Sequence, residues 1–363
     1  MSIDDRKGEA GADAPTDAPG TGWTEAYAGD DPVAEEVQFE QFARTIATMQ
    51  RVVALRAGEP PMRALQAKPT LAMGGAELRF RDDLAPDLQA GFVQPGATYP
   101  VVLRFSNAAQ QIQPDAESDL RGVALRVHVA PDNSIDLLLT NDPVSYARDA
   151  RQFVEFAAAF TRHSRGAALL SLTRLFGVQE TARMVRTVTR ARRHRPCSLF
   201  TETYWSRGAI TWGPALAVRY LLRPSRSTVP VDSALRRTAA LGPDGLAAEA
   251  AARLSAGPVV MALCLQRYRD PVSTPIEDTA VEWSQDDAPA IPIAELTLPR
   301  RDVTGSEARG DADAIEAMAF SPWNTVAGFR PLGNLNRARN AAYRASAQGR
   351  ASRASAGSAS GPV

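Results

Sequence analysis

The chain has 363 residues, of which 44% are hydrophobic, and its 41 lysine and arginine residues balance 41 aspartate and glutamate residues. This length and composition are typical of a globular protein with a sizeable core. The zero formal net charge argues against nucleic acid or an anionic membrane as the main partner.

The N-terminal segment predicts neither export nor a membrane anchor. It carries acidic and small residues where a secretory signal has a basic stretch followed by an apolar one. No apolar run approaches the roughly 18 residues that a membrane span needs. We therefore expect a cytoplasmic protein with no membrane partner. Its two cysteines, Cys197 and Cys264, are too few for a disulfide framework or a zinc cage, so we expect buried free thiols.

The first part of the chain predicts an arm, a helix and a group of strands. Residues 1–35 are rich in Ala, Gly, Pro and Asp, which predicts a disordered arm. Apolar side chains at helical spacing predict a helix over 34–57. Segments dense in β-forming residues then occur at 71–83, 99–108, 122–133 and 135–143. The last two are joined by Pro-Asp-Asn, which predicts a hairpin in an antiparallel meander.

The rest of the chain predicts helices between two groups of strands. Helical periodicity occurs at 151–160, 168–177 and 181–195. Strand patterns return at 215–222, 259–270, 280–284 and 294–299. A helix is predicted at 245–254 between the first two of these strands. Residues 335–348 predict a C-terminal helix, and 344–363 have the Ser/Ala/Gly composition of a flexible tail.

Eight strand segments, split into two groups of four by helices, determine the predicted fold class. It is α+β, with an eight-stranded antiparallel β-barrel, helical insertions and a C-terminal helix. A parallel α/β fold would need regular alternation of strands and helices, which the sequence lacks. We expect one barrel domain over 36–343 between the arm and the tail.

The titratable residues do not form a recognisable metal or nucleophile motif. His128, His163 and His194 lack the spacing of a zinc or non-haem iron site, and hydrolase and nucleotide-binding signatures are missing. We expect His163 and His194 on the surface and His128 in the barrel wall. The helix at 181–195 carries arginines on one face, which indicates a solvated face or a surface for an acidic partner. These are Arg183, Arg186, Arg190 and Arg193.

Six segments together carry a family resemblance. They are RALQAKP (63–69), VVLRFSNA (101–108), SDLRGVALRV (118–127), IDLLLTNDPVSYARDARQFVEF (135–156), AITWGPALAVRYLL (209–222) and FSPWNTVAGFRPLGNLNRARNAAY (320–343). In order and approximate spacing the set resembles the catalase superfamily of haem proteins. The resemblance implies an eight-stranded antiparallel barrel that encloses haem, as in small members without a flavodoxin-like domain, and a homo-oligomer.

On the distal side, the resemblance implies that the proton-moving residue of the family is replaced. In the family, a His three residues after an Arg moves the proton that lets the O–O bond of peroxide break. Arg63 is kept here, but the His position is Gln66, whose amide donates hydrogen bonds and cannot act as a general base. The distal Asn of the family corresponds to Thr140, with Asn141 beside it.

On the proximal side, the family has an axial tyrosinate four residues after an Arg. Arg330 matches this Arg, but the fourth position onward is Asn334, whose neutral amide is a poor axial ligand. Tyr343 is nine residues further along a predicted helix, or about 13 Å at the helical rise per residue. We therefore expect that Tyr343 does not take the ligand's place.

The resemblance also implies roles for four supporting residues. Arg104 matches the arginine that binds a haem propionate, Ser106 matches the serine that supports the distal His, and Phe153 and Phe156 match aromatic residues beside the haem. Two alternatives stay open: Arg104 as a structural arginine paired with a carboxylate, and the two phenylalanines as ordinary core residues.

Three functions can be weighed against these residues. Catalase activity is not expected, because the proton shuttle and the axial phenolate are both replaced. The favoured hypothesis is a peroxidase-like haem protein with degenerate distal and proximal sites, which acts on an organic hydroperoxide or a related small molecule. Gln66 and Thr140 would occupy its catalytic positions. The alternative is a haem-free barrel for binding or interaction, with the cavity refilled by side chains.

Overall fold

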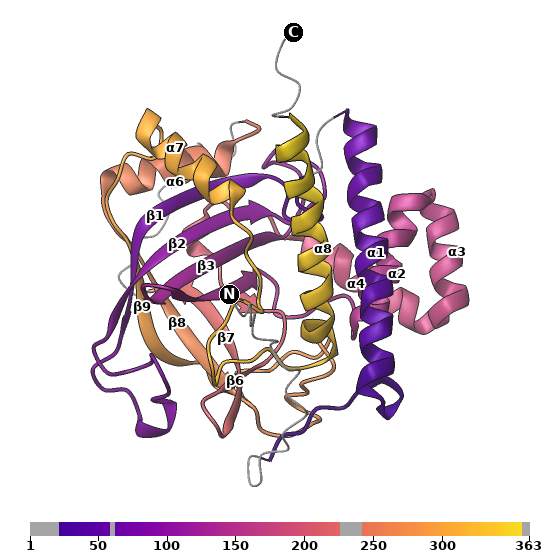
Figure 1. Cartoon of the computed structure of the whole chain (residues 1–363), viewed down its shortest axis with the longest axis horizontal. Helices are drawn as coiled ribbons and strands as arrows, with labels where there is room; N and C mark the ends of the chain where they lie inside the picture. The colour runs from indigo at the N-terminus through magenta and orange to yellow at the C-terminus, as the bar shows by residue number, and fades with distance from the viewer. Residues whose placement is uncertain (1–21, 59–61, 226–241, 358–363) are drawn as a thin grey trace, which may run out of the picture.

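The computed structural model describes residues 22–58, 62–225 and 242–357 of the chain (Figure 1). Within them, the strands are β1 (Pro69–Phe80), β2 (Thr98–Asn107), β3 (Arg121–Ala130), β4 (Asn133–Thr140), β5 (Tyr204–Ser206), β6 (Ile210–Trp212), β7 (Leu216–Pro224), β8 (Val259–Arg267) and β9 (Ile291–Leu298). They form one antiparallel sheet in the order β5-β4-β3-β2-β1-β9-β8-β7-β6, and a further β5–β7 pairing closes eight strands into a barrel. The predicted eight-stranded antiparallel barrel is confirmed.

The helices pack outside this barrel. They are α1 (Pro32–Ala57), α2 (Ala150–Arg162), α3 (Arg165–Phe176), α4 (Val178–Arg193), α6 (Gly245–Ala256), α7 (Ser306–Ala317) and α8 (Asn334–Gly357), with short 3-10 turns η1 (Ala28–Asp30), η2 (Pro86–Leu88) and η3 (Leu199–Thr201). Figure 1 shows α1 and α8 side by side next to the barrel, with α2, α3 and α4 beyond them. No helix in the described parts is long and apolar enough to cross a membrane.

The barrel interior is a packed apolar core rather than an open cavity. On β2, Leu103 and Phe105 are fully buried among core residues, while Arg104 and Ser106 point to the opposite face. This alternation follows from the period of two residues in a strand. Because the helices cover that opposite face, the space for a ligand lies between the outer barrel wall and the helices. A barrel that encloses the ligand, as the resemblance implied, is therefore not what the structure shows.

Three element predictions were incomplete or wrong. Residues 280–284 form an irregular loop rather than a strand, and Trp283 is buried there in a cluster with Trp23 and Ile276. Three-residue strands such as β5 and β6 are too short to show periodicity in the sequence. The helix α7 was missed because it buries few side chains, among them Ala308 and Ile315.

The ends of the described chain are more ordered than their composition suggested. Residues 22–35 belong to the predicted disordered arm, yet Trp23 is buried, and Glu25 forms ion pairs with Arg330 and Arg337. Charged partners about 300 residues away cannot be read from local composition. Similarly, α8 continues to residue 357, through part of the predicted tail. Residues 1–21 and 358–363 lie outside the described residues.

Predictions for the isolated His and Cys residues were partly confirmed. His163 and His194 are exposed, and His128 is half-buried in β3, which forms part of the barrel wall. Cys264 is a buried free thiol as expected. Cys197 is a free thiol but only half-buried, because it lies in the segment that leads from α4 to the barrel.

Candidate functional site

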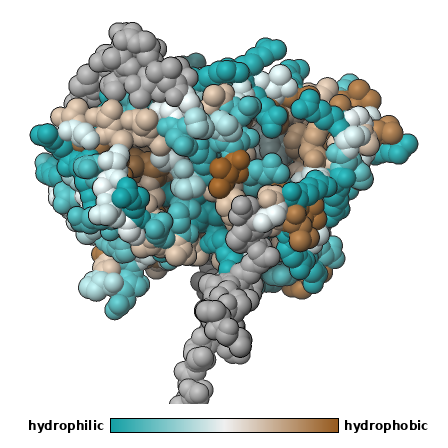
Figure 2. All heavy atoms as spheres, turned by 90° about the horizontal axis from the view of Figure 1, so that it is seen from above, coloured by the Kyte–Doolittle hydropathy of each residue, from teal (hydrophilic) through white to brown (hydrophobic). Residues whose placement is uncertain are grey.

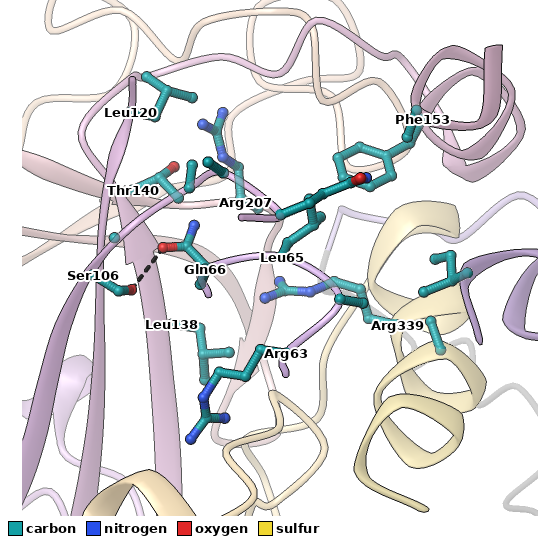
Figure 3. A pocket seen from close by; sticks show the side chains of 18 of the residues that line it. Arg63, Leu65, Gln66, Ser106, Leu120, Leu138, Thr140, Phe153, Arg207 and Arg339 are labelled. Carbon is teal, nitrogen blue, oxygen red and sulfur yellow. Dashed lines mark hydrogen bonds between the residues drawn. The ribbon is translucent and has the colours of Figure 1, made fainter. Parts of the chain in front are cut away.

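A cavity of about 610 Å³ lies between the outer wall of the barrel and the helices. Its floor comes from outward-facing positions of neighbouring strands, including Ser106 on β2, Gly122 on β3 and Thr140 on β4. Ser106 and Gly122 are register partners, and so are Gly122 and Thr140, so the three positions form one row across the sheet. The segment before β1 and the helix α8 complete the walls (Figure 3).

The structure brings together seven of the nine predicted site residues. The cavity is lined by Arg63, Gln66, Arg104, Ser106, Thr140, Phe153 and Phe156. The remaining two, Arg330 and Asn334, do not line it. The distal positions and the supporting residues thus form one site, whereas the predicted proximal positions do not.

Gln66 is held rigidly against the barrel wall. Its backbone φ of 61° lies in the left-handed region, which is rare for a residue other than glycine and often marks a functional position. Ser106 Oγ donates to Gln66 Oε1 at 2.8 Å, and Arg104 Nη2 donates to the Gln66 carbonyl oxygen at 3.0 Å (Figure 3). These bonds fix both the backbone and the amide, and they leave the amide nitrogen free to donate toward the cavity.

Thr140 is the second polar group in this part of the cavity. Its Oγ1 is buried and has no hydrogen-bond partner among the described residues. The neighbouring Asn141 does not compete for the same role, because its side chain accepts from Arg121 N at 2.6 Å and donates to Glu202 at 3.0 Å. A buried hydroxyl without a partner is costly unless a ligand or water binds it. Thr140 is therefore available to a ligand.

Gly122 makes room for the Gln66 amide. A Cβ at this position would lie 2.4 Å from Gln66 Oε1, closer than real atoms approach. We expect Gly122→Ala to displace Gln66 and to lower the free energy of unfolding by about 1–3 kcal/mol, as overpacking usually does. Thermal unfolding measures this effect. The matched control is Gly74→Ala, another strand glycine, whose added Cβ would meet nothing within 4 Å. Equal losses in the two variants would contradict this prediction.

Three arginines surround a single carboxylate at one side of the cavity. Arg104 forms an ion pair with both oxygens of Glu316, and Arg63 Nε lies 3.9 Å from the same carboxylate. Burial lowers the pKa of Arg63 to about 9, and repulsion from Arg104 and Arg350 adds to this shift. Burial and Arg104 likewise lower the pKa of Arg350. The described residues therefore leave part of the positive charge of this cluster unneutralised, which suits an anionic ligand.

The contacts of Arg104 bear on the question whether it is only a structural arginine paired with a carboxylate. The guanidinium is paired with a carboxylate, as a structural arginine would be. It also holds the backbone of Gln66 and lines the cavity. Arg104 thus links the cationic side of the cavity to the distal amide.

Two residues of α8 also line the cavity: Tyr343, which the sequence analysis set aside, and Arg339, which it did not consider. Tyr343 follows Arg339 by four residues, so the two lie one above the other on the same helix face. Arg339 Nη2 donates to the Tyr343 hydroxyl at 3.0 Å. In Figure 3, Arg339 extends from α8 into the cavity toward Leu65 and Gln66. This pair presents a phenol oxygen with a guanidinium beside it.

Arg330 and Asn334 have structural roles, which corrects the predicted proximal site. Arg330 Nη2 pairs with Glu25 at 2.6 Å. Asn334 donates from Nδ2 to Glu35 at 2.7 Å and accepts from Ala150 N at 2.9 Å. Both residues therefore fasten the start of α8 to the N-terminal segment and to α2. The same Arg-x-x-x-Tyr spacing recurs in RNAAY at 339–343, in residues that do line the cavity.

Aromatic side chains form the wall on the α2 side. The rings of Tyr146 and Phe153 stack with centroids 5.3 Å apart, and those of Tyr146 and Phe156 are 4.5 Å apart. Burial raises the pKa of Tyr146, so its phenol stays neutral. The two phenylalanines line the cavity and also pack with neighbouring rings. This wall suits a flat apolar ligand.

Comparisons with known proteins point to one family. The Catalase family model matches residues 45–176. A catalase-related peroxidase of Mycolicibacterium paratuberculosis is 26% identical over 283 residues, which are 75% of this chain and 83% of that protein. Catalase isozyme 2 of Cucurbita pepo is 33% identical over 102 residues, which are 28% of this chain but only 20% of the plant protein.

Solved catalase structures share the fold. A bacterial catalase superposes with a TM-score of 0.60 at 20% identity, over 96% of this chain and 67% of that one. Catalase A from Saccharomyces cerevisiae gives 0.62 at 17% identity, over 83% of this chain and 63% of the yeast enzyme. The chain thus spans about two thirds of these solved catalases.

Proposed function

This chain belongs to the catalase superfamily, and we propose that it is a haem protein that acts on an organic hydroperoxide or a related peroxide rather than as a true catalase. The observation that carries the proposal is the cavity itself. It joins a phenol, excess positive charge, an aromatic wall and a polar but non-basic distal pair, Gln66 and Thr140.

The residues of the cavity fit haem. Tyr343 would hold the haem iron through its phenol oxygen, as the tyrosinate of the family does, with the positive charge of Arg339 beside it. The propionates would lie near Arg63, Arg104 and Arg350, whose positive charge Glu316 only partly neutralises. The aromatic wall on α2 would pack against the ring. When bound, haem supplies the iron that reacts with a peroxide.

The distal residues determine which peroxides suit the site. Dismutation of hydrogen peroxide needs a group that takes a proton from one peroxide oxygen and returns it to the other. Gln66 donates a hydrogen bond but has no basic nitrogen, and the hydroxyls of Ser106 and Thr140 do not titrate near neutral pH. These groups can orient a peroxide and stabilise developing charge on its oxygens. Cleavage of an organic hydroperoxide still moves one proton to the departing alkoxide oxygen, but it omits the second half of dismutation, in which two hydrogens are removed from another molecule of hydrogen peroxide.

Haem titration tests this proposal. We expect the purified protein to take up one haem and to develop a Soret band. The haem-loaded protein should then consume cumene hydroperoxide faster than it releases oxygen from hydrogen peroxide. The haem-free alternative assumed that side chains refill the cavity, whereas about 610 Å³ stays open. Absence of any Soret band would nevertheless favour that alternative. Oxygen release at the rate of an ordinary catalase would contradict the assignment at residue 66.

The arginine cluster provides a further prediction. We expect Arg350→Ala to weaken haem binding by roughly tenfold to hundredfold, because a hydrogen bond to a charged group contributes about 1.5–3 kcal/mol. Haem titration measures the change. The matched control is Arg344→Ala on the same helix, because Arg344 is exposed and pairs with Glu40 away from the cavity. A loss of the same size in both variants would indicate that α8 itself is destabilised and that the propionate assignment is wrong.

A further inference from the structure

The α3–α4 region is strongly cationic in a chain without net charge. Residues 162–195 contain nine arginines and a single acidic residue, Glu180. Arg183 pairs with Glu180 at 2.8 Å, and Arg190 pairs with Asp142 at 3.3 Å. The other seven arginines are exposed and form no ion pair with another described residue. They are Arg162, Arg165, Arg174, Arg186, Arg192, Arg193 and Arg195.

The four arginines that the sequence placed on one helix face fall into two pairs in the structure. Arg183 and Arg190 are used in ion pairs within the protein, whereas Arg186 and Arg193 remain exposed. The exposed charge is extended by arginines of α3, such as Arg165 and Arg174, which the sequence analysis did not include. No described carboxylate forms an ion pair with these seven arginines, and Asp119 lies within electrostatic reach of Arg192 alone among them. A solvated face and an anionic partner are therefore both compatible with the charge distribution.

Exposed apolar side chains lie among these arginines, and they decide between a solvated face and a surface for an anionic partner. On α3, Leu170 is 51% exposed and Leu175 is 44% exposed, and Val178 at the start of α4 is 71% exposed. Only the opposite sides of these helices are packed, through residues such as Ala168 and Leu172. Figure 2 shows hydrophobic atoms next to hydrophilic ones at the side of the molecule where Figure 1 places α3. A purely solvated face would not expose several large apolar side chains together.

We propose that the α3–α4 surface, defined by the seven exposed arginines with Leu169, Leu170, Leu175 and Val178, docks onto an anionic lipid bilayer. Aliphatic side chains enter the boundary between headgroups and acyl chains, while arginines bind the lipid phosphates. Nucleic acid would match the arginines but not the leucines. The zero net charge of the whole chain hides this local asymmetry, so the initial expectation of no membrane partner does not apply to this surface.

The docking surface adjoins the cavity. Phe160 is 39% exposed beside α3 and also lines the cavity, and Arg192 is exposed on the surface and lines the cavity as well. The apolar end of the cavity therefore opens next to the bilayer. If the proposed function holds, a hydroperoxide dissolved in the membrane could reach the site without crossing water. The docking itself does not depend on haem.

Vesicle cosedimentation tests the proposal on the full chain. We expect the protein to sediment with vesicles of equimolar phosphatidylcholine and phosphatidylserine and to stay in solution with phosphatidylcholine alone. The double variant Leu170→Ser/Val178→Ser should bind about tenfold more weakly because it loses the apolar contacts, and so should Arg165→Glu/Arg174→Glu because it reverses charge. Raised salt should weaken binding of the wild type.

Matched controls keep the test specific. Val272→Ser removes an apolar side chain that is 82% exposed elsewhere, and Arg309→Glu reverses an exposed charge on α7, so neither should change vesicle binding. No sedimentation with anionic vesicles, or equal binding by variants and controls, would overturn the proposal. So would a dimer in sedimentation velocity that Leu170→Ser/Val178→Ser dissociates, because the surface would then bind a second copy. These readouts do not require haem, so their failure leaves the haem proposal untouched.

Discussion

Tyr343→Phe is expected to abolish the charge-transfer bands of ferric tyrosinate in the haem-loaded protein and to weaken haem binding strongly. The phenol oxygen of Tyr343 lines the cavity, and Arg339 donates to it at 3.0 Å. Phenylalanine keeps the ring and its packing but removes the only atom of this side chain that can bind iron. Visible absorption spectra of the ferric protein and a haem titration measure both effects.

Asn334→Ala serves as the contrasting variant. Asn334 is the position at which the family pattern first placed the axial ligand, but its side chain bonds to Glu35 and to the backbone of Ala150. We expect this variant to be less stable and to keep its tyrosinate bands once loaded with haem. If instead Tyr343→Phe retained the bands and Asn334→Ala lost them, the proximal assignment made from the structure would be wrong.

The sequence predicted those parts of the fold in which local periodicity reflects burial. On β2, Leu103 and Phe105 alternate with Arg104 and Ser106, and this pattern is visible without any structure. The closure of the barrel was not visible in the same way, because β5, which pairs with both β4 and β7, has only three residues. Strands this short carry too few residues for alternation to be recognised.

The residues predicted for the distal side lie together in the cavity, whereas Arg330 and Asn334, predicted for the proximal side, do not line it, and the difference has a physical reason. Gln66, Ser106 and Thr140 lie in or beside strands whose register fixes which residues meet. The residues proposed for the proximal side lie on α8. If the family's Arg is matched to the wrong Arg in the sequence, the position four residues later is wrong as well. Arg330 was matched to that Arg, but it is fixed by Glu25, 305 residues away in the sequence. The structure shows that contact, and it places Arg339 and Tyr343, which have the same Arg-x-x-x-Tyr spacing, at the cavity instead.

Gln66→His is expected to raise oxygen release from hydrogen peroxide by about 10²- to 10⁴-fold in the haem-loaded protein, which is the usual contribution of general acid–base catalysis. The surroundings are suited to an imidazole. Ser106 Oγ lies within hydrogen-bond distance of the present side chain, and Gly122 leaves the space beside it open. The left-handed backbone at this position is tolerated by histidine better than by most residues.

Two further variants separate the proton transfer from simple changes of shape. Gln66→Asn keeps an amide and has no basic nitrogen, so we expect no gain in oxygen release. Gln66→His combined with Ser106→Ala should lose part of the gain, because the hydroxyl that now donates to Gln66 would no longer orient the imidazole. The pH dependence of the gain should follow titration of a histidine, which the wild type lacks at this position. If Gln66→His binds haem normally yet releases oxygen no faster than the wild type, then the assignment of residue 66 to the proton-transfer position is wrong.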